Sequence, residues 1–403
     1  MIKNTLSVLI FIFSITFLYF VGNIYFSENQ ELKVKKNRDT ISKKIQNNIG
    51  NLQILANDTD NVIEFNSGYS KESKKKKKIF GNYLKKKKMI RKAAIISISG
   101  TSLTYKEINI FKKESPWGVI LFKRNILSEK QLKKLTGSIK KIMKDKNYPI
   151  LIDEEGGRVT RLSNILDNST FNQKFFGDMY KIDKKFTLIM YKNYIYSISK
   201  YLRNLGININ TSPVLDLKQK NTHKIIGNRS YSENSTIVNE LGKACVKFYR
   251  INKISTVVKH IPGHGRSNAD SHFKLPVVND SLRLLEKNDF KCFTNTKSHF
   301  AMTAHILYSK IDIKNNATHS KFLIKKIIRK IIGFKGILIS DDISMKALKY
   351  NITKNAKLAR EAGCNLVLYC SGKTHEVKKL LKDTPYIDSF TKKKTSEFYK
   401  FLR

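Results

Sequence analysis

Eight short runs of β-branched and other apolar residues recur beyond residue 92, and they constrain the fold more than any other feature of the chain. Stretches with helical periodicity separate the runs, among them 128–143 and 239–250, and this alternation is typical of repeated β-α units. Eight units in a stretch of this length fit a (β/α)8 TIM-like barrel better than a doubly wound sheet. The predicted strands cover residues 93–98, 118–122, 149–153, 207–215, 256–261, 300–305, 336–340 and 365–369.

A nearly unbroken apolar run covers residues 6–26 and has about the length that spans a bilayer. Bulky Ile24, Tyr25 and Phe26 stand where a small-residue cleavage site would be expected, so an uncleaved hydrophobic anchor is favoured over a cleaved signal peptide. Basic residues follow the run and favour a cytoplasmic location for the rest of the chain. The apolar run would then anchor the chain in the inner membrane.

Residues 27–92 show little periodicity, many Asn, Asp and Ser, and lysine clusters at 74–78 and 85–88. Such a composition is typical of a solvated, disordered linker. We therefore predict four segments: a hydrophobic anchor or signal-like segment at 1–26, a lysine-rich linker at 27–92, the barrel at 93–390 and a C-terminal helical tail at 391–403.

The charge balance is strongly positive, with 77 Lys and Arg against 32 Asp and Glu and a net charge of +45. The excess is spread along the whole chain beside abundant Asn and Ile, so compositional bias explains it better than a nucleic-acid-binding face. The four cysteines show neither a CxxC pair nor a metal-like grouping with His, which indicates neither a zinc site nor a disulfide framework.

Polar residues gather where five of the predicted strands end. The list is Asp153 to Arg158, Asp216, Lys259 with His260, Thr303 with His305, and Asp341 with Asp342. In a barrel the C-terminal ends of the strands lie on one face, where active sites are built. Each group alone could be loop solvation or a helix cap, but together they predict an active site.

The segment from Lys259 to His272 holds three His, two Gly and one Pro, a composition suited to an active-site lid. Asp270 stands two residues before His272, and such an Asp can orient an imidazole and raise its pKa for general acid or base work. A metal bound by His260, His264 and these two residues is the competing interpretation. No helical ligand spacing supports it, so no metal is expected.

At these motifs the sequence resembles glycoside hydrolase family 3, in particular the single-domain bacterial β-N-acetylglucosaminidases of the NagZ type. The resemblance runs in family order from about residue 93 to beyond residue 370. The stretches that carry it are GVILFKRNI, LIDEEGGRVTRL, SPVLDL, IGNRSYSEN, VVKHIPGHGRSNADSHFKLP, AMTAHILYSKID, GFKGILISDDISMKAL and AGCNLVLYC.

The resemblance implies that Asp341 is the nucleophile of a retaining reaction, with His272 as acid/base and Asp270 as its partner. It also implies that the sugar site is lined by a set of charged and imidazole side chains, and that no metal or organic cofactor is needed. The implied set is Asp153, Arg161, Arg229, Lys259 and His260.

The implied activity is a retaining exo-β-N-acetylglucosaminidase that releases terminal N-acetylglucosamine from peptidoglycan-derived muropeptides in cell-wall recycling. A β-glucosidase or another exo-glycosidase of the family is the alternative within this class. A membrane-tethered nucleic-acid-binding protein would explain the lysines but not Asp341 or His272. A catalytically silent glycan-binding barrel is disfavoured because it would not need both a nucleophile and an acid. The expected partners are a small carbohydrate or muropeptide and a membrane reached through residues 6–26, with no nucleic acid; the oligomeric state stays open.

Overall fold

The computed structural model describes residues 90–219, 226–267, 269, 271 and 273–403. The fold described below belongs to the compact unit Lys86–Arg403. The predicted anchor at 6–26 and nearly all of the predicted linker lie outside the described residues. None of the helices within the described ranges is long and apolar enough to cross a membrane.

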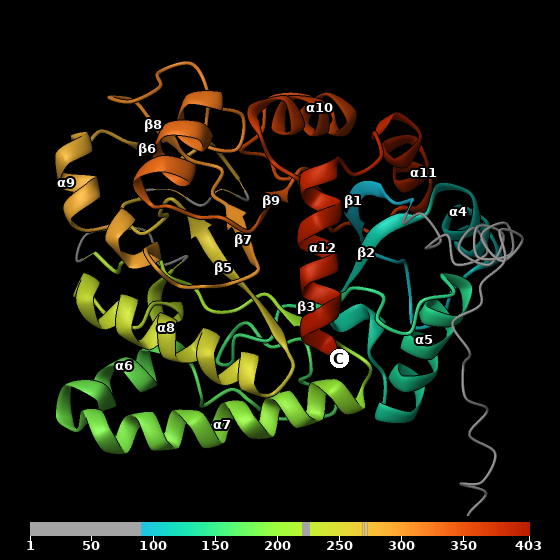
Figure 1. Cartoon of the computed structure of the whole chain (residues 1–403), viewed down its shortest axis with the longest axis horizontal. Coiled ribbons are helices and arrows are strands. Elements are labelled where there is room, and N and C mark those ends of the chain that lie inside the picture. Colours follow the sequence, from blue (N-terminus) through green and yellow to red (C-terminus); the bar gives the residue numbers. More distant parts are fainter. Residues whose placement is uncertain (1–89, 220–225, 268, 270, 272) are drawn as a thin grey trace, which may run out of the picture. The chain divides into compact units, whose positions relative to one another are not determined.

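Eight parallel strands close into a barrel with the neighbour order β1-β10-β9-β7-β5-β4-β3-β2, which confirms the predicted (β/α)8 fold (Figure 1). Each predicted run contributes one strand. β4 has only two ladder residues, because the chain after Asn210 continues as a loop. The strands are β1 (Lys92–Ile96), β2 (Pro116–Leu121), β3 (Ile150–Ile152), β4 (Ile209–Asn210), β5 (Ser255–Ile261), β7 (Phe300–Thr303), β9 (Ile337–Asp342) and β10 (Leu366–Tyr369).

Helices surround the barrel, and local capping signals fix several of their first residues. Ser128 caps the predicted amphipathic helix by accepting from the Gln131 amide, and Asn234 starts another helix four residues before the predicted 239–250 stretch. The helices are α4 (Tyr105–Glu114), α5 (Glu129–Ile142), α6 (Gln173–Ile182), α7 (Lys184–Asn204), α8 (Ser235–Ile251), α9 (Leu282–Lys287), α10 (Ile352–Ala362), α11 (Thr374–Asp383) and α12 (Ser389–Leu402), with short turns η2 (Lys123–Asn125), η3 (Gly227–Arg229), η4 (Phe290–Phe293) and the π-helical η5 (Leu323–Ile331).

Two hydrophobic cores follow from the alternation of side chains along the strands. In β1, Ile95 points into the barrel interior, whereas Ala94 and Ile96 pack in the larger layer between barrel and helices. Both faces of each parallel strand are therefore covered by protein. This double burial explains why the strands appear in the sequence as continuous apolar runs.

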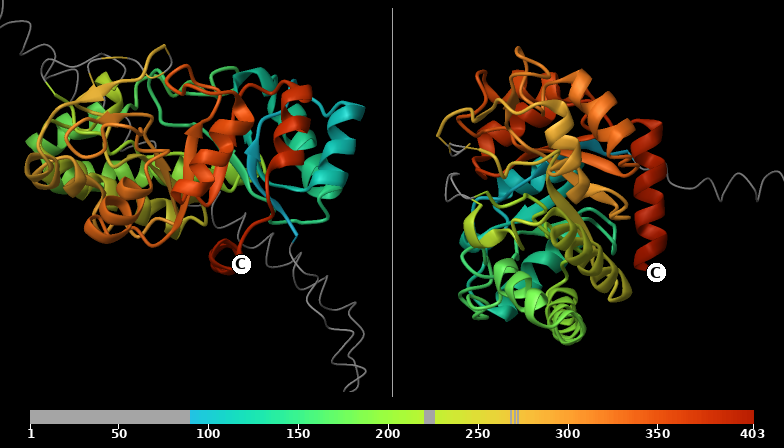
Figure 2. Two further views of the ribbon diagram at one scale, coloured as in Figure 1. Left: turned by 90° about the horizontal axis from the view of Figure 1, so that it is seen from above. Right: turned by 90° about the vertical axis from the view of Figure 1, so that its left-hand side faces the viewer.

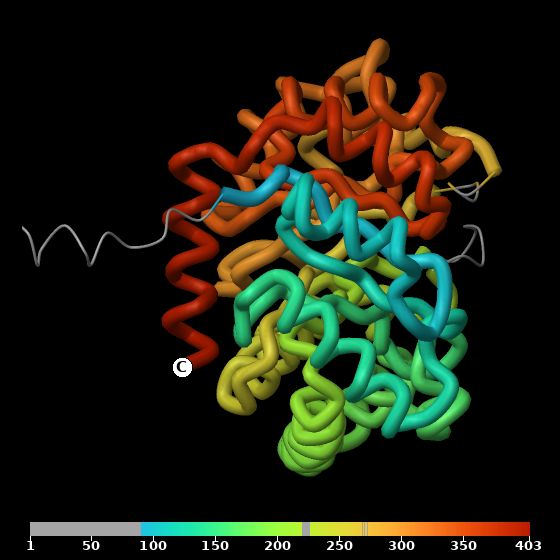
Figure 3. Tube along the Cα trace, turned by 90° about the vertical axis from the view of Figure 1, so that its right-hand side faces the viewer, coloured from blue at the N-terminus to red at the C-terminus, as the bar shows by residue number. Residues whose placement is uncertain are grey.

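Helix α12 closes the N-terminal end of the barrel. The Trp117 indole Nε1 donates to Thr395 Oγ1 at 2.9 Å, and the Phe398 ring lies 5.3 Å from that of Phe300 at the start of β7. Figure 3 shows α12 along one edge of the molecule, with the loop after β5 on the opposite side. A parallel pair that the sequence did not predict, β6 (Val277–Val278) and β8 (Leu307–Tyr308), lies outside the barrel sheet.

Candidate active site

The C-terminal ends of the strands surround a cavity of about 300 Å³. Figure 2 shows from two further sides how the loops after these strands gather at one end of the barrel. Six predicted site residues line the cavity together: Asp153, Arg161, Arg229, Lys259, His260 and Asp341. Asp270 and His272, predicted as catalytic, lie outside the described residues.

Lys259 joins two strand ends through a buried ion-pair network. Its Nζ lies 3.0 Å from Asp153 Oδ1 and 2.6 Å from Glu155 Oε1, and only 2% of the residue is exposed. Arg161 Nη2 holds the other oxygen of Asp153 at 3.0 Å. Burial alone would raise the pKa of Asp153, but Lys259 and Arg161 outweigh it and hold that pKa far below its usual value. Asp153 is therefore a fixed anion that can accept hydrogen bonds.

Glu155 is a member of this network that the sequence did not single out. Arg229 grips it with two hydrogen bonds, Nε to Oε2 at 2.7 Å and Nη2 to Oε1 at 2.8 Å. Burial opposes ionisation of Glu155, yet Arg229 and Lys259 lower its pKa to about 2. Its position two residues after Asp153, in the stretch DEEGGR, was the feature of the sequence that could have identified it as a site residue. The conformation of the backbone after β3 decides which of Asp153, Glu154 and Glu155 face the cavity, and the sequence does not show that conformation.

Asp341 and Asp342 end β9 side by side, but their surroundings differ. Burial would raise the pKa of Asp341, whereas the imidazoles of His305 and His260, the Asp342 amide and Lys259 outweigh it and lower that pKa. Burial dominates at Asp342 and raises its pKa despite hydrogen bonds from Ser344. Both carboxylates line the cavity, and of the two Asp341 has the lower pKa.

Asp216 organises the loop after β5, a role that the sequence did not assign. Its Oδ2 lies 2.6 Å from His260 Nδ1, and its Oδ1 accepts the backbone amide of His264 at 2.7 Å. The Nε2 of His264 lies 3.2 Å from the Ser271 hydroxyl. Burial lowers the pKa of His264 to about 4, so this imidazole is neutral at physiological pH. One buried carboxylate thus fixes two histidines of the lid segment.

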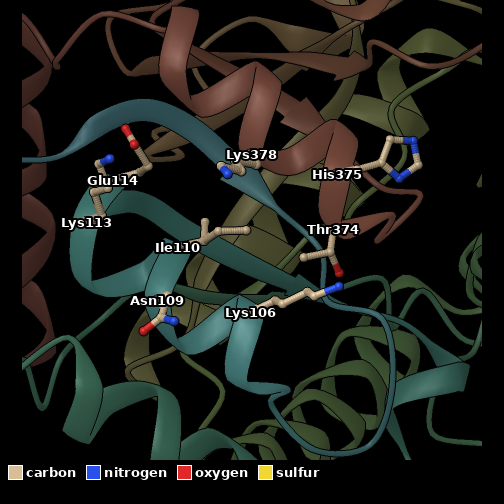
Figure 4. Close-up of a pocket in the computed structure, with 8 residues that line it drawn as sticks. All are labelled: Lys106, Asn109, Ile110, Lys113, Glu114, Thr374, His375 and Lys378. Carbon is tan, nitrogen blue, oxygen red and sulfur yellow. The ribbon is translucent and has the colours of Figure 1, made fainter.

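The described residues contain no group of three or more His, Cys, Asp or Glu side chains placed to hold a metal ion. A larger hollow of about 680 Å³ lies on the outside of the barrel between α4 and α11 (Figure 4). Three of its eight lining residues are lysines, and its one carboxylate, Glu114, pairs with Lys92 at 4.0 Å. This outer groove lacks the convergent carboxylates of the barrel cavity, which remains the candidate active site.

Comparison with known proteins gives concordant matches. The model of a family described as "Glycosyl hydrolase family 3 N terminal domain" matches residues 91–388. The β-hexosaminidase of Bordetella parapertussis is 31% identical over 284 residues, which are 69% of this chain and 79% of that protein. The β-hexosaminidase of Neisseria gonorrhoeae is 33% identical over 291 residues, or 70% and 78% of the two chains. A crystal structure of NagZ from Neisseria gonorrhoeae in complex with N-trifluoroacetyl-D-glucosamine matches with a TM-score of 0.69 at 30% identity, covering 78% of this chain and 90% of that one.

Proposed function

The chain belongs to glycosyl hydrolase family 3 and is a β-N-acetylhexosaminidase, and from this premise we propose that Asp341 is the nucleophile of a retaining hydrolysis. The observation that carries the proposal is the position of this carboxylate at the end of β9, in the wall of the cavity, where imidazoles and Lys259 also lower its pKa. An ionised Asp341 attacks the anomeric carbon, the bond to the leaving oxygen breaks, and a covalent glycosyl-enzyme forms. Water then hydrolyses that intermediate with net retention of configuration.

His272, oriented by Asp270, is the proposed acid/base. The imidazolium donates its proton to the leaving oxygen in the first step, and the neutral imidazole takes a proton from water in the second. Ser271, the residue between the two, lines the cavity and contacts His264, which supports a role for this segment beside Asp341. A His–Asp pair replaces the second carboxylate that most retaining glycosidases use.

The proposed sugar-binding groups are Asp153, Arg161, Arg229, Lys259 and His260. Sugar hydroxyl and N-acyl groups need donors and acceptors at fixed positions, and the ion pairs of this set hold each side chain in place. Because these groups are already ordered before substrate arrives, little conformational entropy is lost on binding.

The proposed substrates are peptidoglycan-derived muropeptides, from which the enzyme removes terminal N-acetylglucosamine in cell-wall recycling. The related NagZ structure holds an N-acylated glucosamine, which favours an N-acetyl substrate over a glucoside. We further propose that the barrel lies on the cytoplasmic side, tethered to the membrane through the apolar residues 6–26.

The test is hydrolysis of 4-nitrophenyl β-N-acetylglucosaminide and of the corresponding glucoside by the full chain. We expect turnover of the N-acetyl substrate, at least about 10³-fold loss in Asp341→Asn, and unchanged turnover in the control Asp167→Asn, whose carboxylate is exposed on a nearby loop. The β-anomer of the sugar should appear first by NMR. Preferred release of glucose would favour the β-glucosidase alternative, and an active Asp341→Asn would exclude the proposed nucleophile.

A further inference from the structure

The N-terminal end of the barrel, opposite the active site, carries a basic hollow of about 770 Å³ between α12 and the loops that precede β5, β7 and β9. We define the basal face as the exposed basic residues in and around this hollow: Arg250, Lys253, Lys297, Lys335, Lys393 and Lys400. The one carboxylate that lines the hollow, Glu397, is paired with Lys394 at 2.7 Å. The net charge of the side chains that line the hollow is therefore strongly positive.

Helix-dipole compensation explains only part of this charge. Arg250 lies in the last turn of α8, where a cation stabilises the helix. Lys297 and Lys335, however, stand in loops, and Lys393 lies outside the last turn of α12, where a cation would be stabilised. The cavity at the other end of the barrel is lined by four carboxylates and four Arg or Lys side chains, whereas the basal hollow is lined by one carboxylate and six Arg or Lys side chains. The two hollows thus differ in charge.

The backbone around the hollow is also unusual. Lys253, Asn295 and Lys297 have positive φ angles of 58°, 56° and 55°, a conformation that side chains other than Gly and Asn rarely adopt. Only two other non-glycine residues in the described part of the chain share it, Ser115 and Lys144. At Lys253 this conformation ends α8, directly after the C-cap Asn252. The positive φ angles hold two lysines at the rim of the hollow.

Large apolar side chains are exposed beside these cations. Ile251 is 60% exposed at the end of α8, and Ile331 is 42% exposed at the end of η5. Phe390, at the start of α12, is 39% exposed and lies under the Arg329 guanidinium at 5.6 Å. Basic residues interspersed with exposed aliphatic and aromatic side chains are typical of surfaces that rest on the headgroup region of a membrane.

We propose that the basal face docks on an anionic lipid surface. α12 lies across this end with its C-terminus exposed (Figure 1), and Asp341 lines a cavity at the opposite end, so docking leaves the active site open to substrate. Residue 90, where the described chain begins, precedes β1 at the basal end, and the Ile387 amide donates to the Arg91 carbonyl there. Each basic residue near an anionic surface strengthens binding about fivefold.

The first experiment maps the contact in the full chain. Lysine acylation by a water-soluble reagent is followed residue by residue, with phosphatidylcholine vesicles that contain or lack phosphatidylglycerol. We expect Lys297, Lys335 and Lys400 to react about tenfold more slowly on the anionic vesicles only. The control lysines Lys310, Lys314 and Lys321, beyond the C-terminal ends of β7 and β8, should react equally on both. Equal protection of the two sets would overturn the proposal.

The second experiment compares two triple variants of equal charge change, Lys297→Glu/Lys335→Glu/Lys400→Glu and Lys310→Glu/Lys314→Glu/Lys321→Glu. The basal variant should lose about a hundredfold of the preference for anionic over neutral vesicles, whereas the control variant should keep most of it. Turnover of the soluble chromogenic substrate should persist in both. Equal losses of this preference in the two variants would show that net charge, and not the basal face, determines binding to anionic vesicles, and would overturn the proposal. If duplex DNA at matched phosphate concentration protected these lysines equally well, nucleic acid would be an equally good ligand of the basal face, and the assignment of lipid as its ligand would be overturned.

Discussion

At the scale of single residues, the buried ion pairs explain how several charged side chains can be buried around one cavity without destabilising the fold. Lys259 lies between Asp153 and Glu155, and each of these carboxylates has a second basic partner, Arg161 or Arg229. The Coulomb attraction within this set offsets the cost of removing its charges from water. A single missing partner therefore leaves a buried charge that water cannot solvate.

Lys259→Met tests this network because it keeps the side-chain volume and removes the charge. We expect the free energy of unfolding to fall by about 3 kcal/mol, since Asp153 and Glu155 lose a shared partner. Turnover should fall about 100-fold, because the two carboxylates no longer hold their positions toward the sugar. Denaturant unfolding and kcat/KM measure the two effects, with exposed Lys310→Met as the control. An unchanged unfolding midpoint would contradict the ion-pair account.

At the scale of secondary-structure elements, close contacts between backbone segments position the lid and close the barrel. A Cβ atom on Gly265 would lie 1.8 Å from the Leu217 carbonyl oxygen, so the loop after β5 packs directly on the loop after β4. At the other end, Phe398 of α12 is fully buried against the barrel interior. The two ends are thus built by different segments.

Gly265→Ala should push the lid segment away from Asp216, since the added methyl group cannot be accommodated beside a carbonyl oxygen. We expect at least about a tenfold loss in kcat/KM, because misplacement of catalytic groups is costly. Gly137→Ala in α5 is the matched control, for no atom lies within 4 Å of the added Cβ. That control should be active and about 1 kcal/mol more stable. Full activity of Gly265→Ala would refute this packing.

Phe398→Ala should lower the free energy of unfolding by about 3 to 5 kcal/mol through the cavity that it leaves. Because Phe398 lies at the end opposite Asp341, the kcat/KM of the folded fraction should not change. Phe390→Ala, on the same helix but 39% exposed, should cost less than about 1 kcal/mol. Chemical denaturation together with active-site kinetics separates the two effects. Equal destabilisation by both variants would argue against α12 as a closing element.

At the scale of the whole molecule, buried neutral histidines make stability depend on pH. Burial lowers the pKa of His264, His299 and His319 to about 4 each, whereas an unfolded His titrates near 6.5. Between these values the unfolded chain binds more protons, so stability is lost as the pH falls from about 6.5 toward 4. Burial raises the pKa of Asp289 to about 6 and also raises the pKa values of Glu154 and Asp342, and these groups act in the opposite direction.

We therefore expect the free energy of unfolding to fall by roughly 2 kcal/mol per histidine between pH 7 and pH 5. His299→Gln, at the end of the barrel opposite Asp341, should flatten this pH dependence by about a third without affecting turnover. Thermal melts at several pH values measure the slope. A melting temperature that stays constant from pH 7 to pH 5 would show that these histidines remain accessible to protons.

The sequence by itself determined the fold class and the catalytic end of the barrel. Strands buried on both faces must be continuous apolar runs, and parallel strands bring their C-terminal ends to one face. Six of the predicted site residues accordingly line one cavity. The motif resemblance also identified the family, and the comparisons confirmed it.

Only the tertiary structure decided which charged groups meet. Glu155 and Asp216 became visible as positioning residues through contacts with Arg229, His260 and His264, over separations that no local pattern records. Long-range packing likewise determines the burial of α12 against the barrel, the β6–β8 pair and the different charges of the two hollows. Sequence periodicity reports the burial of a segment, whereas the partner that buries it is fixed only when the chain closes on itself.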